Sequence, residues 1–182
     1  MLNVARTWGT TAAERARSYS CDAVIADADD LFRGVDVAAP ADITYRRLCH
    51  LRVAPYSYDW VDNGGRRSPR EFLEGVDALT AGERVMSIFT LVSFQPGAHL
   101  TMRLTAPRGR RLFGDIAVSY VVTPLSPTAS RLIAKLRVAR RGSALARLRF
   151  ELLAWGDLIM MRKQLLTLAR LAERDWRSRA AC

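Results

Sequence analysis

The sequence predicts an α+β fold in which a curved antiparallel sheet packs against one long C-terminal helix. Residues 143–177 contain no proline and are rich in leucine, arginine, alanine, methionine and glutamate, which favour a helix. Residues 83–139 instead follow a two-residue period, broken by short turn sequences, as strands do. Two short helices are expected between a first strand and that run. The predicted order is therefore strand, two helices, several strands and one long helix.

The N-terminal residues 1–32 are weakly patterned and predict an arm that lies over the surface of the protein. Thr11 and Glu14 have capping-box spacing for a short helical turn, and Trp8 is a candidate anchor for the arm. Residues 33–182 contain no internal repeat and no low-complexity linker. This predicts a single domain with its own core.

The first strand is expected at residues 33–38 and ends before Pro40. Asp42 is suited to cap the next helix, at residues 43–51, and Pro55 stops that helix. Residues 56–62 predict a turn that passes into a strand, which the Asn-Gly-Gly sequence at 63–65 ends. The second short helix is expected at residues 69–76, with Ser68 as its N-cap and Pro69 in its first turn.

Four further strands are expected, at residues 84–95, 99–105, 112–123 and 131–139. Their connections are short, which favours antiparallel pairing of successive strands. Alternation separates the two faces of each strand, and in the last strand it groups Leu132, Ala134, Leu136 and Val138. A sheet of this length twists and curls, so the long helix is expected to cross its concave face with a space between them.

The long helix carries two apolar stripes. The first consists of Leu145, Leu148, Leu152, Trp155 and Ile159, and the second consists of Leu158, Met161, Leu165, Leu168 and Ala172. At about 100° per residue, the second stripe is rotated from the first by roughly a third of a turn. The shift falls at Gly156 and Asp157, which indicates a bend or different neighbours at the two ends. Aspartate is unfavourable inside a helix, so Asp157 is expected to pair with an arginine.

The chain has a formal net charge of +10 and a pI of about 10.5. Lys135 and Lys163 are its two lysines, and its many arginines are scattered, with small groups in apparent turns. Together with the richness in alanine, this pattern indicates a compositional bias and a solvated surface more than a nucleic-acid site. The alternative interpretation is that some of these arginines form a basic rim with a functional role.

Several classes of protein are disfavoured by what the sequence lacks. Cys21, Cys49 and Cys182 form no CxxC pair, which argues against a disulfide framework and structural zinc. P-loop, dinucleotide-binding and HExxH motifs are absent, so we expect no cofactor and no metal. Ser119 has no surrounding GxSxG elbow, and Cys49 and His50 are helix neighbours that do not face each other. No secretory signal and no apolar run of membrane-spanning length is seen, so we expect a cytoplasmic location.

Four groups of residues stand out along the chain. They are Trp8-Gly9-Thr10-Thr11 with Glu14 and Cys21-Asp22; residues 34–40 and 56–60; Phe113-Gly114-Asp115 with Val118-Ser119-Tyr120; and Trp155-Gly156-Asp157 with residues 160–166. With the order of elements, they resemble the START-like helix-grip superfamily (SRPBCC), which includes polyketide cyclase/dehydrase and lipid-transfer proteins, and more narrowly an actinobacterial branch of it. The resemblance covers nearly the whole chain and implies a hydrophobic cavity between the sheet and the long helix. It implies no single activity and carries over no catalytic residue.

Such a cavity would be lined by the concave face of the sheet and by the long helix. The apolar candidates are aromatic and methionine side chains, which suit an adaptable pocket: Tyr56, Tyr58, Trp60, Phe89, Met102, Trp155, Met160 and Met161. The polar candidates are Asp59, His99, Arg103, Asp115, Ser119, Tyr120, Lys135 and Asp157. Alternation places His99 and Arg103 on the same face of one strand, and Asp115 and Ser119 on the same face of another. It does not decide whether either face belongs to the concave side of the sheet. A carboxylate beside an arginine could orient a ligand or act as acid or base; a structural ion pair is the alternative.

The leading hypothesis is binding, or transport, of a small hydrophobic molecule. The second is an enzyme of the cyclase or dehydratase type that uses a polar group of the cavity, and the sequence leaves open whether the protein is an enzyme at all. The third is a basic module that docks on an anionic surface. No specific nucleic-acid partner is expected, and a homodimer is compatible with the sequence.

Overall fold

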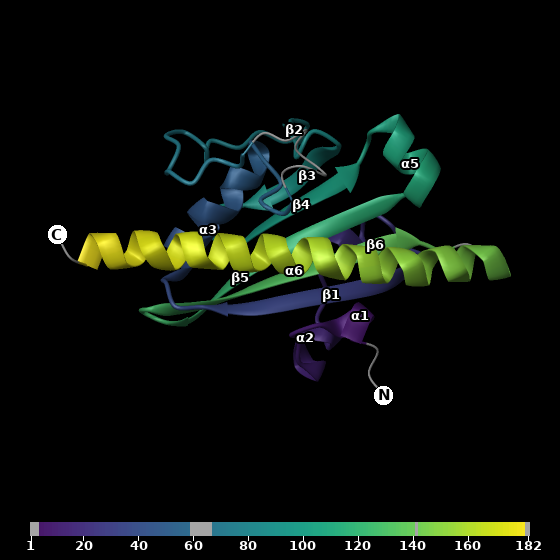
Figure 1. Ribbon diagram of the computed structural model, residues 1–182, viewed down its shortest axis with the longest axis horizontal. Coiled ribbons are helices and arrows are strands. Elements are labelled where there is room, and N and C mark those ends of the chain that lie inside the picture. The colour runs from purple at the N-terminus through teal and green to yellow at the C-terminus, as the bar shows by residue number, and fades with distance from the viewer. Residues whose placement is uncertain (1–3, 59–66, 141, 181–182) are drawn as a thin grey trace.

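The computed structural model describes residues 4–58, 67–140 and 142–180. Six antiparallel strands form one curved, open sheet in the order β1-β6-β5-β4-β3-β2, and the long helix α6 crosses one of its faces (Figure 1). The strands are β1 (Ala28–Val37), β2 (Arg84–Val85), β3 (Phe89–Gln95), β4 (His99–Leu104), β5 (Ile116–Ser126) and β6 (Ala129–Ala139). The helices are α1 (Val4–Thr7), α2 (Ala12–Ala16), α3 (Ala41–Cys49), α5 (Pro107–Phe113) and α6 (Ala144–Ala180), with 3-10 turns at Ser20–Asp22 and His50–Arg52. The predicted fold class is confirmed.

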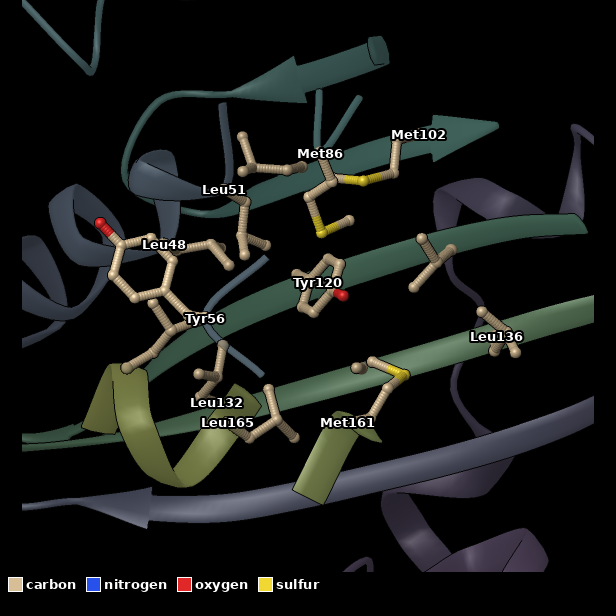
Figure 2. Close-up of a cluster of buried hydrophobic side chains, with 14 of the residues drawn as sticks. Leu48, Leu51, Tyr56, Met86, Met102, Tyr120, Leu132, Leu136, Met161 and Leu165 are labelled. Atoms are coloured by element: carbon tan, nitrogen blue, oxygen red, sulfur yellow. The ribbon is translucent and has the colours of Figure 1, made fainter. Parts of the chain in front are cut away.

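The faces of the sheet follow the predicted alternation. The side that faces α6, here called the inner face, carries Leu100, Met102 and Leu104 of β4 together with Leu132, Ala134, Leu136 and Val138 of β6. Figure 2 shows part of this core, where side chains from α3, α6 and the strands meet. The opposite, outer face is covered by the N-terminal segment, through a smaller cluster that contains Cys21, Ile25, Phe32, Ala117 and Ile133.

The N-terminal segment is tied to the sheet by local features of its sequence. The predicted capping box is confirmed: Thr11 caps α2 and the Glu14 carboxylate accepts from the Thr11 N–H. Trp8 is partly buried against the main core, as expected of an anchor. Gly9 has a φ of +71°, and a Cβ there would collide with the Gly34 carbonyl of β1, so the close approach needs glycine.

Several element boundaries differ from the predictions. β1 begins at Ala28, five residues earlier than expected, and the run at 84–95 divides into β2 and β3 where Met86 and Ser87 adopt positive φ. A turn and the start of a strand were expected at residues 107–113, but the helix α5 forms there. Pro107 begins this helix, and Gly114, at φ +86°, ends it.

The second short helix, expected at residues 69–76, does not form. Residues 67–76 adopt turns and irregular structure instead. Tyr56, Arg47 and Arg174 donate hydrogen bonds to the carbonyls of residues 69, 71 and 70, which a helix would use itself. The strand predicted to follow the turn at 56–62 falls largely on residues that the structure does not describe.

The two apolar stripes of α6 differ in burial. The second stripe is buried against the sheet and α3, with Leu165 and Ala172 fully inaccessible. The first stripe faces solvent: Leu145, Leu148, Leu152, Trp155 and Ile159 are 53–65% exposed. The helix runs without a break through Gly156, so the shift of stripes marks a change of surroundings rather than an interruption. Within the described residues, no helix combines the length and the hydrophobicity that a bilayer crossing requires.

Replacing Gly156 by alanine should raise the free energy of unfolding by about 0.5–1 kcal/mol, because alanine is the better helix former. A Cβ at Gly156 meets nothing within 4 Å, so no clash opposes the gain. Urea unfolding followed by circular dichroism measures the change. The control is Gly142→Ala, which is equally open but precedes the helix and should change little. A destabilised Gly156→Ala variant would show that the glycine serves a strained backbone.

Candidate functional site

A cavity of about 950 Å³ lies between α6 and the inner face of the sheet. Its walls are mostly apolar. The strand residues that line it are Phe89, Leu104, Ile116, Val118, Tyr120 and Leu136, and the α6 residues are Arg149, Leu152, Leu153, Gly156, Asp157, Met160, Met161 and Gln164. Pro55, Ser57, Met86 and Ile88 complete the side near β2, and Arg111, Leu112 and Phe113 of α5 stand at the exposed, open side. The volume suits a small molecule.

The apolar character of the cavity follows from the local structure. Alternate residues of β5, Ile116, Val118 and Tyr120, point to the inner face. Met160 and Met161 of α6 provide flexible thioether side chains opposite them. Figure 2 shows Tyr120, Leu136 and Met161 around the same space, each from a different element.

A neutral hydrogen-bonded pair occupies one side of the cavity. The Tyr120 hydroxyl donates to Gln164 Oε1 at 2.6 Å, and Gln164 Nε2 donates to the Pro55 carbonyl at 2.7 Å. Burial raises the pKa of Tyr120, and the nearby Asp157 carboxylate raises it further. The phenol is therefore neutral, and its oxygen can accept a hydrogen bond from a guest.

Asp157 is the one carboxylate among the described residues that line the cavity. Its Oδ2 accepts from Arg33 Nη2 at 2.7 Å, so the predicted pairing with an arginine is confirmed. Arg33 lies on β1, is 0% exposed, and also donates to the carbonyls of Phe32 and Ala154, at 2.8 and 3.2 Å. Burial raises the pKa of Asp157 to about 6, and Arg33 opposes this shift.

Four of the predicted site residues line the cavity: Phe89, Tyr120, Asp157 and Met161. Met160, a further candidate, lines it as well. The remaining apolar candidates lie elsewhere. Met102 is buried in the core beside the cavity, and Trp155 is exposed on the outer side of α6. Tyr56 is buried with its hydroxyl bonded to His50 and to the Pro69 carbonyl, and Tyr58 is half-buried away from the lining. Asp59 and Trp60 fall outside the described residues.

Apart from Tyr120, the polar candidates on the strands lie on the outer face. Ser119 accepts from the Cys21 N–H at 2.9 Å, His99 contacts Ser20 at 3.2 Å, and Arg103 forms a two-point ion pair with Asp115. Lys135 pairs with Asp22 and Asp30 at 2.5 and 3.1 Å. Ser119, His99 and Lys135 thus join the N-terminal segment to the sheet, whereas Arg103 and Asp115 pair with each other beside it. None of these residues lines the cavity.

Several polar residues of the site were not among the predicted candidates. They are Arg33 and Gln164, and, nearer the edge of the lining, Ser57, Arg111 and Arg149. Arg33 shares its strand face with Val35 and Val37, so a charged residue at an apolar position was the available signal. Gln164 interrupts the second stripe of α6 between Met161 and Leu168. In both cases a polar residue on an otherwise apolar face marks the polar side of the cavity.

The stability of the wild type relative to Asp157→Asn should fall as the pH rises from about 4 to about 6. The folded-state pKa of Asp157 lies above its ordinary value of 3.8, at about 6. Between these values the folded state keeps a proton that the unfolded state has lost, so stability declines by about 1.4 kcal/mol per pH unit. Urea unfolding of both proteins across this range measures the difference. A difference that stays constant, or grows with pH, would contradict the assignment.

No family model matches the sequence, and no curated protein is similar to it. Solved structures are similar in fold. A protein from Thermobifida fusca has 17% identity and a TM-score of 0.54 over 80% of this chain and 93% of its own. A protein from Mesorhizobium loti has 16% identity and a TM-score of 0.51 over 80% of this chain and 98% of its own. The di-domain ARO/CYC protein BexL has 15% identity and a TM-score of 0.50 over 80% of this chain and 46% of its own.

The protein belongs to the α+β class of sheet-and-helix proteins with an apolar cavity, and its fold is the helix-grip fold that the sequence predicts. Identities this low establish the fold alone. The function therefore has to be argued from the chemistry of the cavity.

Proposed function

We propose that the protein binds a small, mainly apolar molecule in the cavity, and that this molecule donates a hydrogen bond to Asp157. The observation that carries the proposal is an apolar cavity of about 950 Å³ whose lining includes one carboxylate, held by a buried arginine. The apolar walls supply most of the affinity. Asp157 and the Tyr120 oxygen are acceptors that would orient a hydroxyl-bearing guest.

The expected affinity is moderate. Burying roughly 300 Å² of apolar ligand surface contributes about 7 kcal/mol before the costs of association. Loss of translational and rotational freedom reduces this gain by several kcal/mol, while contacts to Asp157 and Tyr120 add to it. The remaining gain of roughly 4–7 kcal/mol corresponds to dissociation constants between about ten micromolar and about one millimolar.

The experiment is a titration with the apolar fluorescent dye Nile red, followed by displacement with dodecanol and dodecanoate. We expect the dye to bind and dodecanol to displace it more effectively, because the Asp157 carboxylate accepts from an alcohol and repels a carboxylate. In the Asp157→Asn variant, dodecanol and dodecanoate should displace the dye with more similar effectiveness. Absence of dye binding would overturn the proposal, and a preference for dodecanoate would overturn the role of Asp157.

A second candidate function is acid–base catalysis on such a molecule, as in a cyclase or dehydratase. The observation that favours it is the pKa of Asp157, about 6, in a mostly apolar cavity. Substrate turnover that Asp157→Asn abolishes while Nile red binding persists would select this function over binding alone. Asp157→Glu, which keeps the carboxylate, should retain part of the turnover.

A further inference from the structure

The first stripe of α6 forms an exposed apolar ridge, composed of Leu145, Leu148, Leu152, Trp155 and Ile159. These residues are spaced by three and four positions, so they form one side of the helix, and each is more than half exposed. On α5, Leu112 and Phe113 extend the apolar surface and are 68% and 45% exposed. Both border a hollow that α6 residues near Leu145 also line. An apolar surface of this extent marks a contact with something apolar.

Exposed arginines lie beside this ridge, on α5 and on α6. Arg108, Arg110 and Arg111 of α5 and Arg147 and Arg149 of α6 are all exposed. In the described part of the chain, none of the five lies within ion-pair distance of a carboxylate. The outer face differs, because its cations Arg103, Arg131, Lys135 and Arg137 all pair with aspartate or glutamate. A local excess of positive charge therefore lies beside the apolar ridge.

We propose that the ridge and its arginines dock the protein on an anionic lipid bilayer. The apolar side chains would enter the boundary between head groups and acyl chains, and the arginines would contact lipid phosphates. Trp155, one of the ridge residues, is of a type that favours this boundary. Charge complementarity decides between occupants. A second copy would bring ten like-charged guanidinium groups together, whereas an anionic bilayer neutralises them.

The docking surface borders the open side of the cavity. Arg111, Leu112, Phe113, Arg149 and Leu152 belong to both. A protein docked in this way would present the open side of the cavity to the bilayer. Docking on a bilayer does not require a particular guest in the cavity, so it is tested independently of the proposed ligand binding.

Vesicle flotation of the full-length protein tests the proposal, with vesicles of phosphatidylcholine alone and of phosphatidylcholine mixed with phosphatidylglycerol. We expect binding to the anionic vesicles, weakened by salt, and little binding to the neutral ones. Leu148→Glu with Trp155→Glu should lower the bound fraction at least roughly tenfold. Arg147→Glu with Arg149→Glu should lower it by about fivefold per arginine or more.

Matched controls separate this surface from general charge and hydrophobicity. Leu125→Glu removes a leucine that is 59% exposed at the end of β5, and Arg177→Glu with Arg179→Glu removes two cations at the far end of α6. Both controls should bind vesicles more strongly than the corresponding ridge variants. Failure to bind anionic vesicles, equal binding to both vesicles, or ridge variants that bind like the wild type would each overturn the proposal. So would a wild-type dimer that Leu148→Glu with Trp155→Glu dissociates, because the ridge would then be an interface between copies.

Discussion

Replacing Arg33 by methionine should lower the free energy of unfolding at neutral pH by roughly 3–5 kcal/mol, the usual cost of removing one partner from a buried ion pair. Methionine keeps most of the volume of the arginine side chain, so packing on β1 is largely preserved. What is lost is the partner of Asp157 at 2.7 Å, together with two hydrogen bonds to carbonyls. Because Arg33 holds the pKa of Asp157 down, the Asp157 carboxyl must then either take up a proton or stay charged in the cavity wall without a compensating charge. Chemical denaturation at pH 7.5 measures the loss.

Two further variants make the result specific to this pair. Arg33→Met combined with Asp157→Leu removes both charges and should recover much of the lost stability, because replacing both members of a buried pair is far less costly than removing one. Arg140→Met removes an arginine that is 55% exposed and pairs with Asp27 and Asp29, and it should cost about 1 kcal/mol or less. An Arg33→Met protein as stable as the wild type, or a double variant without recovery, would contradict this account.

Replacing Val118 by tryptophan should lower the affinity for Nile red by roughly tenfold or more. Val118 is on the inner face of β5 and lines the cavity, so a larger side chain occupies space that the dye needs. Displacing about 60 Å² of buried dye surface accounts for about a tenfold loss. The titration is carried out on protein whose fold has been checked by circular dichroism, because overpacking can cost about 1–3 kcal/mol of stability.

The matched control is Val121→Trp. Val121 lies on the same strand but packs against the outer-face cluster, so the same change of residue cannot reach the cavity. This variant should bind the dye like the wild type. Equal affinities of the two variants would mean that the dye binds outside the cavity between the sheet and α6.

The fold could be predicted because periodicity reports local structure well. The alternation of Leu132, Ala134, Leu136 and Val138 defines one face of β6, and the structure confirms it. The absence of proline and the two stripes define α6. Boundaries were less accurate where special backbone conformations intervene, as at Met86, Ser87 and Gly114, whose positive φ values no periodic pattern encodes.

The site was harder to predict because both faces of the sheet are covered. The N-terminal segment buries the outer face, so Ser119 and Thr101 are as inaccessible as the inner core, and burial does not distinguish the faces. The apolar pattern of α6 was also a poor guide to which side of the helix is buried, since its first stripe is exposed. Spacing identifies Leu145, Leu148 and Leu152 as one side of a helix, but it does not show whether their partner belongs to the same chain. Asp157 could be found because it is out of place in a helix interior.

Native mass spectrometry of the purified full-length chain tests the central claim most directly. Wild-type protein, incubated with Nile red or a lipid extract, should show the mass of the chain plus one small molecule. Val118→Trp should show much less of this species, and Val121→Trp should match the wild type. A wild-type spectrum that contains only the bare chain after both incubations would contradict the claim that the space beneath α6 is a ligand-binding cavity.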